Sequence, residues 1–155
     1  MRFHVPMQRR WRDLDTYGHV NNATIIAFLE EARLRTFGLA DEDSDEPRPL
    51  GTERPSTDPA TFWLVARHEI EYVTPIPYRS EPLDVQLWVS QLKGASLTVE
   101  YAMCEPGEER SYVRASTEIV LVDSTTNRPR RIRDDERAVW EPYLGPATQF
   151  RRRPS

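Results

Sequence analysis

The segment from Ala23 to Phe37 constrains the fold more than any other part of the chain. It contains neither glycine nor proline, and its first two turns are apolar on nearly every side. A helix that is apolar around its whole circumference is expected to be buried. Asn21 and Asn22 are favourable N-cap residues in front of it, and Gly38 follows where a left-handed C-cap is common. The sequence therefore predicts one long central helix.

Most of the remaining chain is predicted to form strands. Apolar and polar residues alternate from Phe3, which predicts a first strand that runs to about Arg12. After the helix, four segments are rich in β-branched and aromatic residues: 62–73, 83–92, 96–104 and 112–122. Short turn-like separators predict that these strands pair antiparallel in sequence order. A short final helix is expected at 134–143.

One helix and several antiparallel strands have a simple α+β solution, in which a curved antiparallel sheet wraps around the helix. A chain of 155 residues fits one domain. We assign residues 1–144 to this domain, with an acidic, proline-rich loop at 39–60 and a flexible basic tail at 145–155. Exposed strand edges are usually paired or covered, so a homodimer or homotetramer is expected.

Composition argues against several classes of partner. The formal net charge of −4 provides no broad attraction for nucleic acid. Cys104 is the single cysteine, so no disulfide can form within the chain, as is usual inside cells. The sequence has no signal-peptide pattern and no apolar stretch of membrane-spanning length. We therefore expect a cytoplasmic protein that binds neither nucleic acid nor membrane.

The polar stretch between the first strand and the helix, RWRDLDTYGHVNN at residues 10–22, is the best candidate for a functional site. Unpaired backbone N–H groups at a helix start can hold an anion or a developing oxyanion. Gly18 would allow the chain to pass close to a ligand. A carboxylate just upstream could attack, or direct water at, a carbonyl that these N–H groups polarise. Acyl transfer to water is the chemistry that this pattern suggests.

The text DTYGHVNNATIIAFLEEAR resembles the D-x-x-G-H-V-N-N-x-x-Y/I-x-x-F-x-E-x-A-R signature of the 4-hydroxybenzoyl-CoA thioesterase group, which includes tol-pal-associated and long-chain acyl-CoA thioesterases. Residues 65–89 and 116–129 resemble later strands of that group. The resemblance implies a hotdog fold and hydrolysis of acyl-CoA, with no metal or redox cofactor. Many members carry another residue where this chain has Asn22, so the side chain of Asn22 has no assigned role.

The resemblance places the catalytic aspartate on Asp15 and the N–H that polarises the thioester carbonyl near Asn22. An exposed aspartate is ionised at neutral pH, so Asp15 would act as nucleophile or general base. The alternative is that Asp15 only stabilises a turn. The imidazole of His19 would orient Asp15 or a water molecule, although a structural histidine fits the sequence as well.

Further residues are expected to contact the substrate. Tyr17, Ile25 and Phe62 would line an acyl pocket, and basic or polar side chains would hold the CoA moiety. The candidate substrate-binding residues are Tyr17, Gly18, Asn21, Ile25, Phe62, Arg67, Lys93 and Ser96. On the helix, the spacing of Glu30 with Arg33 and of Glu31 with Arg35 predicts ion pairs. The rival hypothesis is a non-catalytic module that binds acyl-CoA in the same pocket.

Overall fold

The computed structural model describes residues 1–37 and 60–151. The predicted loop at 39–60 therefore lies outside the described residues except for Ala60. The described secondary-structure elements, in chain order, are β1 (Phe3–Met7), η1 (Trp11–Asp13), α1 (Asn22–Phe37), β2 (Thr61–Tyr72), β3 (Leu83–Leu92), β4 (Ser96–Cys104), β5 (Ser111–Asp123), β6 (Arg128–Pro129), α2 (Asp134–Trp140) and η2 (Glu141–Tyr143).

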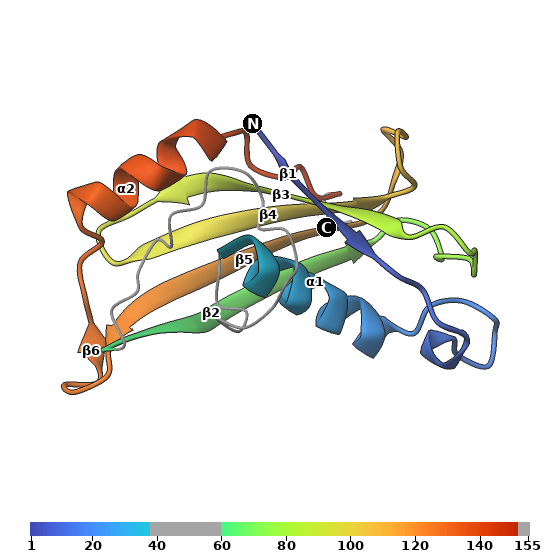
Figure 1. Ribbon diagram of the computed structural model, residues 1–155, viewed down its shortest axis with the longest axis horizontal. Helices are drawn as coiled ribbons and strands as arrows, with labels where there is room; N and C mark the ends of the chain where they lie inside the picture. Colours follow the sequence, from blue (N-terminus) through green and yellow to red (C-terminus); the bar gives the residue numbers. More distant parts are fainter. Residues whose placement is uncertain (38–59, 152–155) are drawn as a thin grey trace.

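The strands form one antiparallel sheet in the order β1-β3-β4-β5-β2, and β6 pairs with β5 (Figure 1). The predicted bounds of β3 and β4 are confirmed. The first strand is shorter than predicted and ends at Met7, because Arg9 turns its side chain into the protein and the chain then enters η1. The hairpins β3-β4 and β4-β5 confirm the predicted pairing of neighbours.

The prediction that β2 also pairs in sequence order is wrong. β2 lies beside β5 at one edge of the sheet, while β1 occupies the place next to β3 at the other edge. Residues 73–82 carry the chain from β2 at one edge to β3, which lies next to β1 at the other edge, and Pro75 and Pro77 keep this connection out of the sheet. The pocket described below lies against this connection.

Helix α1 lies against one face of the sheet (Figure 1). Ile25, Phe28 and Leu29 of the helix belong to the same apolar core as the inward residues of the strands. The prediction that the helix is buried on every side is wrong, since Ile26 on its outer side is 41% exposed. At the far end of α1, Trp140 of α2 packs edge-to-face against Phe37, with ring centroids 4.5 Å apart.

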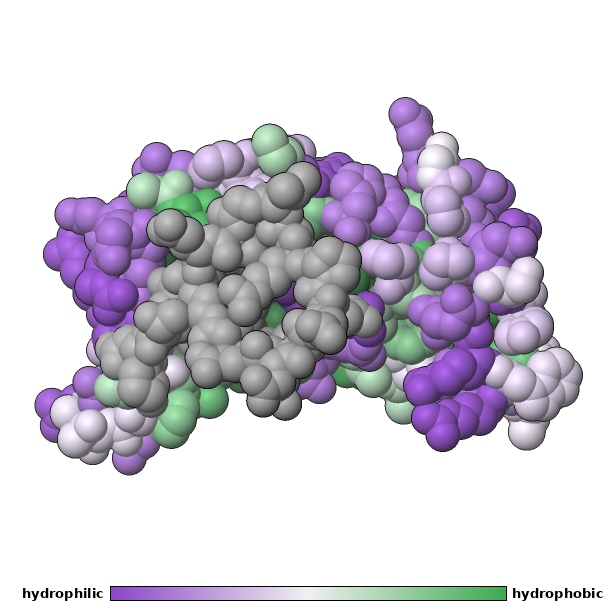
Figure 2. All heavy atoms as spheres, in the orientation of Figure 1, coloured by the Kyte–Doolittle hydropathy of each residue, from purple (hydrophilic) through white to green (hydrophobic). Residues whose placement is uncertain are grey.

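An antiparallel sheet with helices on one face is consistent with the hotdog fold. On the face shown in Figure 2, hydrophilic residues dominate both ends of the molecule and apolar surface is confined to smaller areas. None of the helices in residues 1–37 and 60–151 is long and apolar enough to cross a membrane.

Candidate active site

The loop before α1 folds into a tight turn around Asp15. The backbone N–H of Asp15 donates to the carbonyl of His19 at 2.8 Å, and the N–H of Gly18 donates back to the carbonyl of Asp15 at 3.1 Å. Gly18 adopts a φ of +77°, a left-handed conformation that favours glycine. Val20 then extends beside Leu14 in an isolated antiparallel bridge. The turn fixes the backbone of Asp15 with respect to the helix start.

The two carboxylate oxygens of Asp15 have different surroundings. Oδ1 accepts the backbone N–H of Tyr17 at 2.8 Å and that of His19 at 3.2 Å. Oδ2 accepts no hydrogen bond from any residue of the described chain. Asp15 therefore does stabilise the turn, as the alternative reading of the sequence suggested, and one oxygen remains available for a ligand or for water.

The start of α1 is capped by Asn21. Its side-chain Oδ1 accepts the N–H of Ala23 at 2.8 Å, and its carbonyl accepts the N–H of Ile25 at 3.0 Å. This confirms Asn21 as the helix N-cap. Within the described chain, no acceptor is found for the backbone N–H of Asn22. The first helical residue thus offers an unpaired donor, reinforced by the helix dipole.

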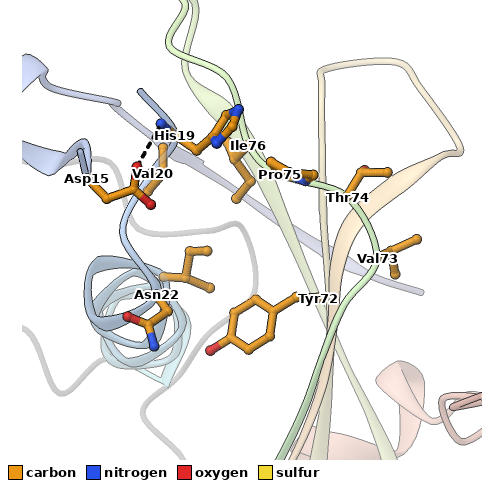
Figure 3. Close-up of a pocket in the computed structure, with 10 residues that line it drawn as sticks. Asp15, His19, Val20, Asn22, Tyr72, Val73, Thr74, Pro75 and Ile76 are labelled. Carbon is orange, nitrogen blue, oxygen red and sulfur yellow. Dashed lines mark hydrogen bonds between the residues drawn. The ribbon is translucent and has the colours of Figure 1, made fainter. Parts of the chain in front are cut away.

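Asp15 and Asn22 line the same cavity, of about 330 Å³. Its other wall is formed by the end of β2 and the connection that follows. Figure 3 shows the two walls facing each other, with the hydroxyl of Tyr72 directed toward Asn22. The lining residues are Asp15, His19, Val20, Asn22, Ile25, Tyr72, Val73, Thr74, Pro75 and Ile76.

The two walls are joined by backbone contacts. The N–H of Val20 donates to the carbonyl of Ile76 at 3.0 Å, and His19 forms a bridge with Pro77. The imidazole of His19 lines the cavity but makes no hydrogen bond to Asp15 among the described residues; its backbone N–H does so instead. A catalytic role for this imidazole stays a prediction.

Several predicted substrate-binding residues lie near the cavity. Ile25 lines it, and Gly18 and Asn21 shape the loop and helix start beside it. Tyr17 lies in the same turn as Asp15, yet the residue is 84% exposed and is not among those that line the cavity. Its predicted place in an acyl pocket is therefore not seen within the single chain.

Other predicted residues lie far from the cavity in the same chain. Phe62 is near the opposite end of β2 from Tyr72. Arg67 pairs with Glu69 at 3.2 Å. Lys93 and Ser96 both bond Glu118 beside the β3-β4 turn. The chain does not bring these three basic or polar groups to Asp15, and their predicted contacts with CoA remain untested.

The wall from Tyr72 to Ile76 was not predicted from sequence as part of the site. Pro75 and Pro77 in the connection were recognisable as a break after a strand, but no local sequence feature indicates which part of the protein the connection packs against.

The expected ion pairs on α1 are confirmed: Glu30 lies 3.8 Å from Arg33, and Glu31 pairs with Arg35. Among the described residues, no cluster of His, Cys, Asp or Glu is suited to hold a metal ion.

A model of the thioesterase-like superfamily matches residues 9–139, which include the loop, the helix and both cavity walls. The chain belongs to this superfamily. No curated protein matches the sequence at a significant level.

Solved thioesterase structures share the fold. A thioesterase from Thermus thermophilus, solved in complex with coenzyme A and Zn, is 27% identical with a TM-score of 0.68, covering 95% of this chain and 96% of that one. A probable thioesterase from Escherichia coli is 25% identical with a TM-score of 0.69, covering 94% and 99%. A DHNA-CoA thioesterase from Staphylococcus aureus, 20% identical with a TM-score of 0.64 and covering 84% and 80%, is similar in fold alone.

Proposed function

We propose that this superfamily member is a cytoplasmic acyl-CoA thioesterase of the 4-hydroxybenzoyl-CoA thioesterase type, with the hotdog sheet wrapped around α1. The observation that carries the proposal is the placement of Asp15 and Asn22 on one cavity. Within residues 1–37 and 60–151, Oδ2 of Asp15 has no hydrogen-bond donor and the N–H of Asn22 at the helix start has no acceptor. A thioester carbonyl held by that N–H would accumulate negative charge where the helix dipole stabilises it.

Two routes lead from this arrangement to products. As general base, Asp15 would take a proton from water while the water oxygen bonds to the carbonyl carbon; collapse of the oxyanion would break the C–S bond and return the proton to the CoA thiolate. As nucleophile, Asp15 would itself displace the thiolate, and water would hydrolyse the resulting anhydride. The similarity to a thioesterase that binds coenzyme A supports acyl-CoA as the substrate class.

Replacement of Asp15 by Asn tests the proposal with little disturbance of the fold, because the amide oxygen can still accept the N–H groups of Tyr17 and His19. We expect kcat/KM for thioester hydrolysis to fall by about 10² or more, since an amide can act neither as base nor as nucleophile. Asp135→Asn, at an exposed carboxylate in α2, is the control and should keep wild-type activity. Equal rates for Asp15→Asn and wild type over short, long and aromatic acyl-CoAs would refute the assignment.

The alternative function is a non-catalytic acyl-CoA-binding module. It is favoured if calorimetry detects saturable acyl-CoA binding while a thiol assay detects no CoA release by wild type. If hydrolysis occurs, a single turnover in ¹⁸O-labelled water tests the nucleophilic route, because label in the peptide that carries Asp15 requires attack of water on the aspartyl carbonyl of an anhydride. Label found only in the released acid follows from the general-base route and also from attack of water on the acyl carbonyl of the anhydride, so trapping of an acyl-enzyme with hydroxylamine then distinguishes the two.

A homodimer is part of the proposal. β2 is an edge strand whose Phe62, Leu64, Val65 and Tyr72 are each more than 40% exposed. Figure 2 shows apolar surface along this edge. Antiparallel pairing of two β2 strands centred near Arg67 would put Phe62 of one copy opposite Tyr72 of the other, at the cavity. Association of two such dimers would give a homotetramer. Light scattering that shows a monomer at micromolar concentration would contradict this part.

A further inference from the structure

The cavity wall at residues 73–76 is anchored by a buried ion pair outside the cavity. The guanidinium of Arg9 binds the carboxylate of Glu105 through two parallel hydrogen bonds, Nη1 to Oε1 at 2.8 Å and Nη2 to Oε2 at 3.0 Å. The Arg9 side chain is fully buried and that of Glu105 is 6% exposed. Such forked pairs fix the geometry of both partners.

Arg9 uses its remaining donors on the backbone that follows the wall. Nη1 donates to the carbonyl of Pro77 at 3.2 Å, and Nη2 and Nε donate to the carbonyl of Glu81 at 2.6 and 3.2 Å. These carbonyls belong to a connection that has no strand partners along most of its length. One buried cation therefore fixes the distal end of the connection.

Tyr112 ties the other end of the connection to the same pair. Its hydroxyl donates to Oε1 of Glu105 at 2.9 Å, and its carbonyl accepts the N–H groups of Val73 at 2.8 Å and Thr74 at 3.2 Å. Between the two anchors the connection passes Asp15's loop, where Ile76 accepts the N–H of Val20. The wall is thus held from both ends by one hydrogen-bonded group.

We propose that Arg9, Glu105 and Tyr112 are positioning residues of the acyl-CoA site. They do not contact the substrate, but they set the separation between the 73–76 wall and the Asp15–Asn22 wall. The inference rests on the proposed function. None of the three residues lines the cavity. A buried ion pair often adds no net stability over apolar residues of the same size, so its placement here is better accounted for by the geometry that it fixes.

The chain offers a matched control for loss of a buried ion pair. Arg130 binds Glu136 through two hydrogen bonds of 2.9 and 2.6 Å, and the Glu136 side chain is 2% exposed. This pair joins the segment after β6 to α2, at the opposite end of the molecule from the η1 loop (Figure 1). Glu136→Gln should therefore disturb a comparable pair without reaching the site.

The experiment compares Glu105→Gln and Tyr112→Phe with Glu136→Gln and wild type. Melting temperatures are measured first, and then kcat and KM well below the lowest melting temperature. The substrate is whichever of acetyl-, octanoyl-, palmitoyl- and benzoyl-CoA wild type hydrolyses best. We expect Glu105→Gln and Glu136→Gln to lose stability alike, while only Glu105→Gln raises KM, by about tenfold. Tyr112→Phe, which loses a single hydrogen bond, should raise KM by about two- to threefold with little loss of stability.

Wild-type kcat and KM in both Glu105→Gln and Tyr112→Phe would overturn the inference and leave the proposed function intact. A KM that rises equally in Glu136→Gln would also overturn it, because general destabilisation would then explain the effect. If wild type hydrolyses none of the four compounds, the proposed function fails. The positioning role is then tested by calorimetric affinities for the same compounds. It is refuted if Glu105→Gln and Glu136→Gln bind these compounds with equal affinity, or if wild type binds none of them.

Discussion

Gly18 allows the loop that carries Asp15 to turn back on itself. Its φ of +77° is left-handed, whereas an added Cβ would meet no heavy atom within 4 Å, so any cost of Gly18→Ala lies in the backbone alone. We expect a loss of about 1–2 kcal/mol, or roughly 2–8 °C in melting temperature, together with a lower kcat/KM as Asp15 shifts.

Gly94→Ala provides the comparison for this substitution. Its Cβ would also enter open space, and Gly94 does not have a positive φ. Calorimetric melting curves and CoA-release assays on both variants check the prediction. Equal melting temperatures for the two variants would show that the turn at Gly18 tolerates a side chain.

The carboxylate of Glu105 should make stability depend on acid pH. Hydrogen bonds from Arg9 hold its pKa below the ordinary range; burial opposes this, and Tyr112 and Arg79 add to the lowering. Because the unfolded chain titrates near 4.3, the stabilisation is complete above about pH 5 and is lost as the pH falls through the folded pKa. Urea unfolding of wild type and Glu105→Gln should therefore differ most above pH 5 and converge below it. A difference that stays constant down to pH 3 would contradict this.

Helix α1 depends on its N-cap, Asn21, to keep the backbone N–H of Asn22 at the cavity. Asn21→Ala removes the acceptor for the Ala23 N–H and should cost about 1 kcal/mol of unfolding free energy, while Asn21→Ser should keep most of it. Fraying of the first turn would also displace the proposed donor, so KM should rise in Asn21→Ala. Urea titrations and steady-state kinetics measure both effects. The prediction fails if Ala and Ser variants behave alike.

Elements defined by local signals could be predicted from the sequence. The limits of β3 and β4 follow from turn residues at their ends, and α1 follows from its cap and an uninterrupted run. The place of β2 could not be predicted, because its pairing with β5 depends on which strand occupies the other edge. The wall at Tyr72–Ile76 was missed for the same reason: its proximity to Asp15 comes from the sheet rather than from spacing along the chain.

In the molecule as a whole, Arg2 near the N-terminus and Gly145 after η2 meet on the sheet at Trp88. The guanidinium of Arg2 lies 4.0 Å from the centre of the Trp88 ring, and Gly145 approaches the same ring so closely that a Cβ would lie 2.9 Å from it. The terminal amino group of Met1 donates to the carbonyl of Pro142 at 3.1 Å. Residues 145–151 of the tail thus contact the sheet, which could not be predicted from the polar composition of residues 145–155. The flexibility of the tail stays a prediction.

The C-terminal segment should therefore contribute to global stability. The Trp88 indole donates to the carbonyl of Pro146 at 2.7 Å, the N–H of Gly145 donates to Val89 at 2.9 Å, and the Arg151 N–H donates to Glu71 at 3.1 Å. Deleting residues 145–155 would remove these bonds and uncover Trp88, at a cost of about 3 kcal/mol, or roughly 6–12 °C in melting temperature. Deleting only 152–155 retains every one of these contacts and should lower the melting temperature much less than the longer truncation does. Similar melting temperatures for the two truncations would mean that residues 145–151 lie on the sheet without stabilising it.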